Sequence, residues 1–370
     1  MENVMLYTFS NVKTAANTKW IFSNPTPDIG SIKRSQEFYD AVNRNGRVRY
    51  WACGRYGQRE YSAAEGKKYG DKMQGFVDEI LAAGNRIDFS IQMSGHPNIV
   101  HRYPYYISTD FMPYMDISML DDKPMPRIGT NTAHEQCALY QKASGVICFA
   151  PLLRQFAIDY YDLNPAKITS ICSGITGFVD ENTAKQHKKY ILWLGMDYKR
   201  KDGETLVKAF ETVRKRHPDY HLVLAGSSVQ VEAPNVHCMP FINDVSVIDS
   251  LYRNAAIFAM TSCRENLGLV YLEAMARKTP VIATTRGGMA QMLRNSDSGM
   301  VCAPAAPATL ASYICSLIED QALYERYSQR GYMFAKLNAQ WTTYIERMDD
   351  AIRCWQEDEP VPADYNIYDF

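Results

Sequence analysis

The chain has few of the features that mark secreted, membrane-spanning or nucleic-acid-binding proteins. Its nine cysteines contain no C-x-x-C pair, which argues against a disulfide framework and a zinc site and favours a reducing compartment. No apolar run reaches the ~18 residues that cross a bilayer, and we expect no signal peptide before the first strand. Lys and Arg number 40 against 41 Asp and Glu, so the formal net charge of -1 gives no overall attraction to nucleic acid. These absences favour a cytoplasmic protein.

Motifs of two common enzyme chemistries are also missing. No G-x-G-x-x-G follows the first strand-like run, which disfavours a dinucleotide dehydrogenase. No D-x-D pair occurs, and no His/Cys cluster has the spacing of metal ligands. We therefore expect the protein to use neither a metal ion nor another cofactor.

The charge is unevenly distributed in one early segment. Residues 33–68 contain nine Lys or Arg against four Asp or Glu, a net charge of +5 in 36 residues. A solvated helix face and loop explain such a surplus without any function. The functional alternative is a patch that faces an anionic acceptor or makes peripheral contact with an acidic membrane surface.

Short apolar runs alternate with segments of helical period along most of the chain, which is typical of βαβ units and a mostly parallel sheet. In the first half the expected strands are 3–9, 47–54, 87–93, 103–109 and 145–150, and the expected helices are 31–44, 69–83 and 132–143. In the second half the expected strands are 190–195, 220–226, 256–262 and 280–285, and the expected helices are 203–216, 246–253, 268–277 and 307–318. The fold class is therefore α/β, with two doubly wound Rossmann-like domains.

A polar stretch without periodicity, residues 176–189, separates the two halves and is typical of an interdomain linker. We place the two domains at residues 1–180 and 181–338. Residues 339–370 are expected to form a helix that packs back on the first domain, followed by a loose acidic tail. Two such domains would face each other across a cleft at the carboxyl ends of their strands, where open α/β sheets bind ligands.

The segment "RENLGLVYLEAM" carries two carboxylates, Glu265 on an expected loop and Glu273 within the following helix. Eight residues at 1.5 Å each span about 12 Å, comparable to a diphosphate with a sugar at each end. The amides of Asn266, Leu267 and Gly268 at the helix start suit a phosphate, and the carboxylates can accept hydrogen bonds from sugar hydroxyls. The alternative is a solvent-facing loop glutamate and a helix-surface charge.

Two further loops could meet the same diphosphate. One ends an expected strand at Gly195 and supplies Lys199, Arg200 and Lys201, cations that can neutralise a departing diphosphate without a metal. The alternative there is an exposed basic turn. The other contains Gly30 just before the first expected helix, where its amide could approach the phosphates or serve only the turn.

Together these residues resemble the retaining nucleotide-sugar glycosyltransferases of family 4, which have the GT-B fold. The resemblance lies in "RENLGLVYLEAMARKTPVIATTRGG" (264–288), similar to the E-x7-E segment of that family with its strand and Gly-Gly turn. It extends to residues 195–210, 298–304 and 143–175 and covers about residues 140 to 345, with the first 140 similar in outline. The resemblance implies a GT-B fold with the donor held by the second domain.

The resemblance also implies roles for individual residues. Glu265 matches the carboxylate that contacts the donor sugar, and Glu273 matches the one that holds the ribose. Arg200 and Lys201 match the pair that binds the diphosphate and stabilises the leaving group. Two positions depart from the family pattern, because Met196 stands where an arginine is frequent and Asp202 where a glycine usually follows the lysine.

The acceptor side is less marked in the sequence. Where the family commonly has a histidine near its reaction centre, this chain has Asp110 at the end of an expected strand. Asp110 could orient the acceptor hydroxyl or take its proton, and it could equally cap the next turn. His96 and His101 lie near strand ends in the same half, and we interpret both as structural.

The resemblance implies a retaining transferase that moves a hexose from a nucleoside-diphosphate sugar to a hydroxyl of a glycan-, lipid- or protein-linked acceptor. No nucleophile is evident at the reacting carbon, so we expect attack on the face from which the diphosphate leaves. Two alternatives stay open. One is a non-catalytic nucleotide-sugar-binding partner of another transferase, and the other is a nucleotide-sugar epimerase on the same scaffold.

Overall fold

The computed structural model describes residues 2–7, 48–53, 87–93, 103–110 and 131–370, together with residues 78, 81, 82 and 84. The chain divides into two compact units. The N-terminal unit comprises residues 1–113, 125–174 and 341–365, and the C-terminal unit comprises residues 114–124, 175–340 and 366–370. The expected helix at 31–44, most of the one at 69–83 and nearly all of the basic segment lie outside the described residues. Membrane contact through that segment therefore stays a prediction.

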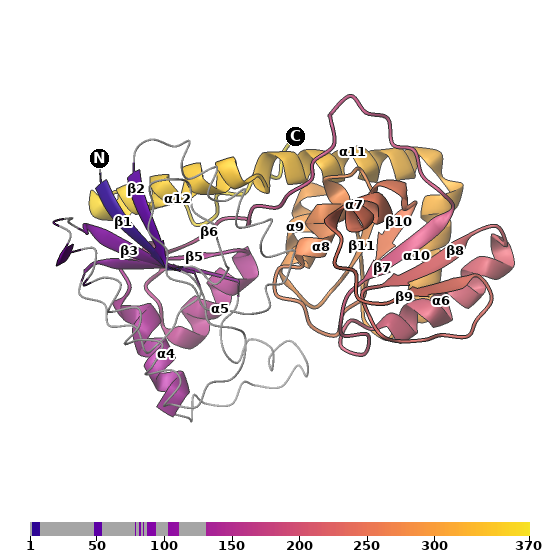
Figure 1. Cartoon of the computed structure of the whole chain (residues 1–370), viewed down its shortest axis with the longest axis horizontal. Helices are drawn as coiled ribbons and strands as arrows, with labels where there is room; N and C mark the ends of the chain where they lie inside the picture. The colour runs from indigo at the N-terminus through magenta and orange to yellow at the C-terminus, as the bar shows by residue number, and fades with distance from the viewer. Residues whose placement is uncertain are drawn as a thin grey trace. The chain divides into compact units, whose positions relative to one another are not determined.

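The N-terminal unit is built on a parallel sheet with strand order β2-β1-β3-β4-β5-β6 (Figure 1). Its strands are β1 (Glu2–Tyr7), β2 (Val48–Cys53), β3 (Phe89–Met93), β4 (Tyr105–Thr109), β5 (Gly145–Cys148) and β6 (Ile168–Ser170). Five of these match expected strands. The sixth, β6, has only three residues, too short a run to separate from a loop by its pattern.

Within the described residues, this unit includes the helices α4 (Asn131–Lys142), α5 (Pro151–Tyr161), the short 3₁₀ helix η1 (Pro165–Lys167) and α12 (Trp341–Gln356). Helix α12 buries Tyr344, Ile345, Met348, Ala351 and Ile352, a helical spacing that gives it one apolar face. No helix among the described residues is both long and apolar enough to cross a membrane.

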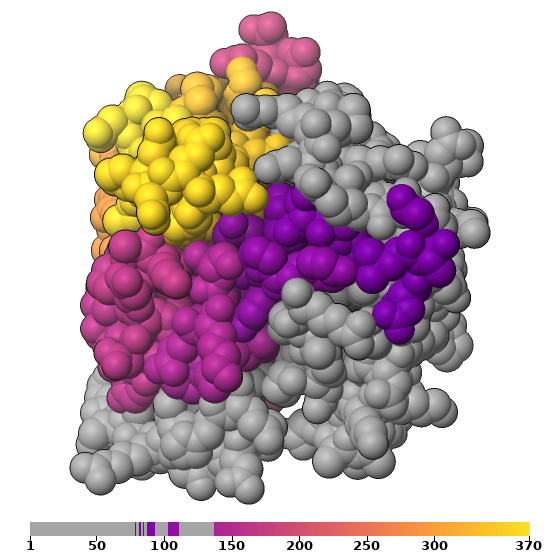
Figure 2. Space-filling model, turned by 90° about the vertical axis from the view of Figure 1, so that its left-hand side faces the viewer, coloured from indigo at the N-terminus to yellow at the C-terminus, as the bar shows by residue number. Residues whose placement is uncertain are grey.

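The end of α12 is anchored on the sheet by Trp355. Its ring stacks on Tyr106 of β4 with centroids 5.8 Å apart, and its Nε1 donates to the carbonyl of Ala166 at 2.9 Å. Gly145 lies beneath the ring, and a Cβ there would stand 2.2 Å from it. In Figure 2 the C-terminal residues, in yellow, lie against purple and magenta residues of the same unit. Helix α12 is thus part of the N-terminal unit.

The acidic tail after α12, expected to be loose, is docked. Ser170 at the end of β6 donates to Asp364 at 2.6 Å. Further on, the amide of Ile367 donates to the Asn338 side chain at 2.7 Å, and that side chain donates back to the Ile367 carbonyl at 2.8 Å. The expectation was wrong because it rested on composition, whereas hydrogen bonds to distant residues order the tail.

The C-terminal unit contains a second parallel sheet, with order β12-β11-β10-β7-β8-β9. Its strands are β7 (Tyr190–Leu194), β8 (His221–Ala225), β9 (Val236–Met239), β10 (Ile257–Ala259), β11 (Val281–Thr284) and β12 (Met300–Cys302). Its helices are α6 (Gly203–Arg216), α7 (Val245–Asn254), α8 (Leu269–Met275), α9 (Gly288–Ser296), α10 (Pro307–Glu319) and α11 (Gln321–Asn338). Four elements were not expected: β9, β12, α9 and α11.

The apolar runs of the central strands are buried, as expected when helices cover both faces of a parallel sheet. Strand β7 begins this half of the chain and lies in the middle of the sheet, next to β10. Later strands extend from β7 in one direction and from β10 in the other. The loops after β7 and β10 therefore lie at the topological switch point, where open α/β sheets bind their ligands.

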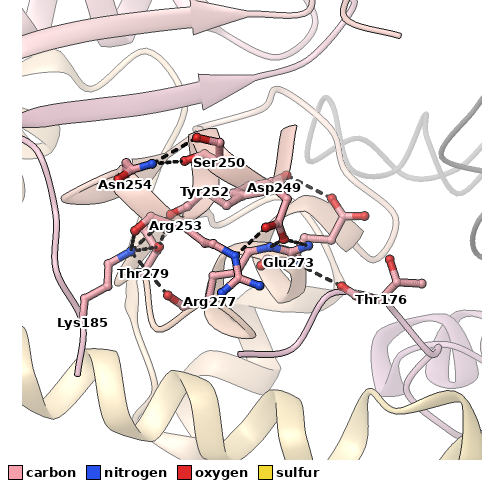
Figure 3. Close-up of polar contacts among 10 residues, drawn as sticks. All are labelled: Thr176, Lys185, Asp249, Ser250, Tyr252, Arg253, Asn254, Glu273, Arg277 and Thr279. Atoms are coloured by element: carbon pink, nitrogen blue, oxygen red, sulfur yellow. Dashed lines mark hydrogen bonds and ion pairs between the residues drawn. The ribbon is translucent and has the colours of Figure 1, made fainter. Parts of the chain in front are cut away.

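The stretch expected to be an interdomain linker, residues 176–189, belongs to the C-terminal unit. Arg277, after α8, donates to the carbonyl of Thr176 at 3.0 Å, and Lys278 donates to the carbonyl of Thr183 at 2.8 Å. In the other direction, Lys185 of this stretch donates to the Thr279 hydroxyl at 2.7 Å (Figure 3). Lysine and arginine side chains thus bind backbone carbonyls of this stretch. From its polar sequence alone, these carbonyls would be expected to face water.

The surroundings of Lys185 shift its pKa. Its ammonium lies against the carbonyls that end α7, donating to Arg253 O at 2.7 Å and to Tyr252 O at 3.2 Å. Burial, together with the positive charges of Arg253 and Arg277, lowers the pKa of Lys185 to about 7. Between that value and the ordinary lysine value near 10.4, the unfolded chain holds a proton that the native protein lacks. Raising the pH through this window therefore favours the native state.

We expect the stability advantage of the wild type over Lys185→Met to grow between about pH 6 and pH 9, with a slope approaching 1.4 kcal/mol per pH unit. Denaturant unfolding of both proteins across this range measures the difference. Lys188→Met, at an exposed lysine of the same segment, is the matched control and should show a flat difference. A Lys185→Met difference independent of pH would contradict the lowered pKa.

Candidate active site

The candidate site is formed by two loops of the C-terminal unit at the switch point. The basic loop, residues 195–202, joins β7 to α6, and the glutamate loop, residues 260–268, joins β10 to α8. The two loops are joined through their backbones, because the Cys263 amide donates to the Arg200 carbonyl at 2.9 Å. The sequence hypothesis placed its main cations and its first carboxylate on these loops, and the structure brings them together.

An ion pair between Lys201 and Glu265 occupies the centre of the site. Lys201 Nζ lies 2.8 Å from Glu265 Oε2, and the two side chains are only 12% and 14% exposed. The Ser262 hydroxyl donates to the same carboxylate oxygen at 3.3 Å. Gly195 makes room for the lysine stem, since a Cβ there would lie 2.6 Å from Lys201 Cδ. Gly195 thus shapes the cation's position.

Arg200 lies beside the pair and is more exposed. Its guanidinium donates to the Arg264 carbonyl at 3.2 Å through Nη1, while Nε lies 3.3 Å from Asp197 Oδ2. The side chain remains 32% exposed, so it can reorient toward an anion. The loop therefore offers one fixed cation and one adjustable cation.

The turn between β11 and α9 is hydrogen-bonded to the backbone of the glutamate loop. The Glu265 amide donates to the Arg286 carbonyl at 2.9 Å, and the Gly288 amide donates to the Asn266 carbonyl at 2.8 Å. A Cβ on Gly287 would stand 2.2 Å from the Glu265 carbonyl oxygen. The close approach of the two backbones requires glycine there.

Helix α8 begins at Leu269, one residue later than expected. Gly268 is its N-cap and has φ 84°, a left-handed conformation that suits glycine. A Cβ there would also lie 2.5 Å from the Tyr271 ring. The Leu267 side chain is buried beneath the loop. The segment Asn266–Gly268 is thus pinned at both ends and leads directly into the helix.

Glu273 belongs to a different hydrogen-bond network from Glu265. Its carboxylate accepts from the Tyr252 hydroxyl at 3.0 Å, and its carbonyl accepts from Arg277 Nη1 at 2.9 Å. Arg277 is in turn paired with Asp249 at 2.9 Å (Figure 3). Sequence analysis did not identify Tyr252 or Asp249, because no short spacing connects α7 to α8.

The structure does not test the other predicted residues. Asp110 follows β4 in the N-terminal unit and is exposed. Gly30, His96 and His101 lie outside the described residues. Within the site, burial raises the pKa of the Cys263 thiol, with the charge of Asp202 acting in the same direction. That thiol stays protonated at neutral pH and is a poor nucleophile.

A possible metal-binding group lies elsewhere in the described part of the chain. His217, Cys315 and Glu319 bring one ligand atom each to within 4.8 Å of one another. The carboxylate already has partners, since Arg216 Nη2 donates to it at 2.6 Å and His217 Nε2 lies 2.8 Å away. The geometry is that of an ion-paired helix end, and it has no connection to the two loops.

Residues 178–334, which include both loops, match the family model described as glycosyl transferases group 1. An uncharacterized glycosyltransferase of Haemophilus influenzae is 26% identical over 181 residues. The aligned part is 46% of this chain and 50% of that protein, so the chain spans about half the length of this curated relative.

Solved structures resemble almost the whole chain. Sucrose-phosphate synthase from Thermosynechococcus elongatus superimposes with a TM-score of 0.69 at 15% identity, covering 97% of this chain and 100% of the other. The chain has the GT-B fold. HepE of Anabaena, determined with UDP-glucose, gives a TM-score of 0.64 at 14% identity and covers 95% of this chain and 100% of that one. The expected fold class is confirmed, and the two sheets described above are the Rossmann-like sheets of GT-B.

We expect Gly287→Ala to displace the glutamate loop of this GT-B protein, because the added Cβ collides with the Glu265 carbonyl. The cost should be about 1–3 kcal/mol of unfolding free energy, typical of overpacking. Denaturant unfolding measures it. Gly331→Ala in α11 is the control, since its Cβ would meet Met275 Cγ and the Ser298 carbonyl oxygen at 3.3 Å, a contact that small shifts relieve, and it should cost less than Gly287→Ala. Equal effects of the two substitutions would contradict this role of Gly287.

Proposed function

We propose that the protein is a retaining glycosyltransferase that moves a hexose from a nucleoside-diphosphate sugar to a hydroxyl of a glycan-, lipid- or protein-linked acceptor. The observation that carries the proposal is the Lys201–Glu265 pair at the switch point of a GT-B C-terminal unit. It puts a cation for phosphate and a carboxylate for a sugar hydroxyl within one hydrogen bond of each other. An ion pair that only stabilised the fold would not need to lie at the edge of the sheet where α/β proteins bind ligands.

The donor's parts can be assigned to residues by their chemistry. Arg200 and Lys201 bind the diphosphate, since charge-assisted hydrogen bonds to phosphate are strong. Glu265 accepts hydrogen bonds from the donor sugar, and Glu273 accepts them from the ribose. The backbone of Asn266–Gly268 and the start of α8 add a partial positive charge.

The ion pair has a consequence for donor binding. In the free protein Lys201 already has an anionic partner, so a diphosphate must compete with Glu265 for the ammonium. Glu265 then exchanges part of that contact for sugar hydroxyls, whose hydrogen bonds to a carboxylate are favourable. Binding of the diphosphate and binding of the sugar are therefore coupled through one contact.

For the chemical step we propose attack by the acceptor hydroxyl on the face from which the diphosphate departs. The leaving phosphate oxygen takes the acceptor's proton. Arg200, Lys201 and the N-terminal end of α8 stabilise the charge that develops on the leaving group, and this stabilisation contributes to rate only because the charge grows in the transition state. These cations make the proposed step independent of a metal ion. Asp110 at the end of β4 is the residue that we propose orients the acceptor hydroxyl.

A donor should stabilise the protein in a base-dependent way. Among uridine, guanosine and adenosine diphosphates, we expect one to raise the melting temperature most, because a ligand at about 100 times its Kd adds about 2.7 kcal/mol to native stability. Thermal unfolding with each nucleotide measures it. No stabilisation by any of the three would contradict a nucleotide-sugar site.

Substituting Lys201 tests catalysis. Lys201→Met should lower kcat by about 10²- to 10³-fold, because it removes a charge that stabilises the leaving group. Turnover is measured as nucleoside diphosphate released from the donor with a panel of acceptors. Lys208→Met, at an exposed lysine of α6 paired with Glu204, is the control and should retain full turnover.

Two outcomes would favour the alternatives. Tight donor binding without transfer to any acceptor would indicate a non-catalytic binding partner, and interconversion of the sugar without nucleotide release would indicate an epimerase. Near-normal transfer by Lys201→Met would contradict the role of the lysine.

A further inference from the structure

Asp202, the last residue of the basic loop, has an unusual backbone and a fully engaged side chain. Its φ of 53° and ψ of 39° are left-handed, a conformation that disfavours most residues with a Cβ and that Asp and Asn tolerate best. As the N-cap of α6 it makes no side-chain cap to the helix amides. Its carboxylate is used elsewhere.

The carboxylate accepts three hydrogen bonds from three separate elements. Thr205 in the first turn of α6 donates to Oδ1 at 2.6 Å. Thr261, at the start of the glutamate loop, donates to Oδ2 at 3.0 Å. The amide of Ala305, in the loop between β12 and α10, donates to Oδ2 at 3.0 Å. One side chain therefore fastens the basic loop to the glutamate loop and to a third loop.

The partners are themselves fixed or strained. Thr261 is fully buried and Thr205 nearly so. Ala305 also has a left-handed backbone, with φ 54°, which for alanine costs roughly 1–2 kcal/mol. A hydrogen bond to a carboxylate helps to offset such a cost. The Asp202 contacts thus add three hydrogen bonds that favour this arrangement of the loops.

Lys201 immediately precedes Asp202, and Arg200 precedes Lys201. We propose that Asp202 is a positioning residue that holds the basic loop in its diphosphate-binding geometry, so that both cations are in place before the ligand arrives. The proposal rests on the proposed function. Preorganised charges bind an anion more tightly than charges that must be ordered on binding.

Two substitutions separate the hydrogen bonds from the charge. Asp202→Asn and Asp202→Gly both remove the negative charge, and both tolerate the left-handed backbone. Asparagine can still accept from Thr261 and Ala305 through its oxygen, while its NH₂ group donates to the Thr205 hydroxyl. Glycine makes none of these bonds. Comparing the two variants therefore isolates the anchoring contacts.

The readout is the affinity for a nucleoside diphosphate relative to its monophosphate. Calorimetric titration of the wild type with uridine, guanosine and adenosine diphosphates and their monophosphates shows which base it binds best. The variants are then titrated with the diphosphate and monophosphate of that base. We expect Asp202→Gly to weaken diphosphate binding about 10-fold relative to Asp202→Asn, the effect of losing one or two hydrogen bonds to a neutral amide. Monophosphate affinity should differ by less than about 2-fold between these variants, because a monophosphate gives Arg200 and Lys201 one phosphate to bind instead of two.

Thr261→Val provides a second test that leaves the backbone at 202 untouched. It removes one of the three donors and should weaken diphosphate binding about 2- to 5-fold, again sparing the monophosphate. If Asp202→Gly does not fold, this variant decides the question.

The proposal is overturned if the glycine and asparagine variants bind diphosphate equally, or if Thr261→Val binds both nucleotides as the wild type does. Equal losses for monophosphate and diphosphate would indicate a structural role only and would overturn it too. Failure of the wild type to bind any nucleoside diphosphate would instead refute the proposed function, so the two failures are distinguishable.

Discussion

The candidate site depends on one ion pair, formed between residues that are 64 positions apart and brought together by strand order. Taking Lys201 and Glu265 largely out of water has a desolvation cost that their attraction only partly offsets. The surroundings reduce that cost, because the Ser262 hydroxyl also serves the carboxylate and Gly195 makes room for the lysine stem. A pair held this way is better suited to exchanging partners than to stabilising the fold.

Support for the pair comes from neighbouring loops more than from helix packing. The turn at Gly287 lies directly against the Glu265 backbone, and Asp202 connects the loop that carries Lys201 to two others. Each support uses a backbone feature that ordinary residues resist, either a close approach without a Cβ or a left-handed conformation. Strained backbone near a ligand site is tolerated when several contacts determine it together.

Buried cations recur outside the site, where they perform a different task. Arg277 and Lys278 donate to carbonyls of residues 176–183, and Lys185 donates to the carbonyls that end α7. The same Arg277 contacts the carbonyl of Glu273, so residues 176–183 and the helix that carries Glu273 share one guanidinium. Solved structures with only 14–15% identity have the same fold.

Local patterns in the sequence determined most strands, several helices, among them α6, α10 and α12, and the chemical types at the site. Continuous apolar runs predicted β7, β8, β10 and β11, because strands covered on both faces need no polar alternation. The short strands β9 and β12 were not predicted, since three or four half-exposed residues are too few to show a periodicity. Likewise, composition suggested a loose tail and an interdomain linker, yet both are hydrogen-bonded to side chains distant in sequence.

The pairings themselves were decided by tertiary structure. Glycine positions, a basic loop and two glutamates could be read from spacing, but not that Lys201 meets Glu265, that Tyr252 meets Glu273, or that Asp202 reaches Ala305. The physical reason is that local periodicity specifies which face of an element is buried. Which loops become neighbours depends on the order of strands in the sheet, and that order is set by packing over the whole unit.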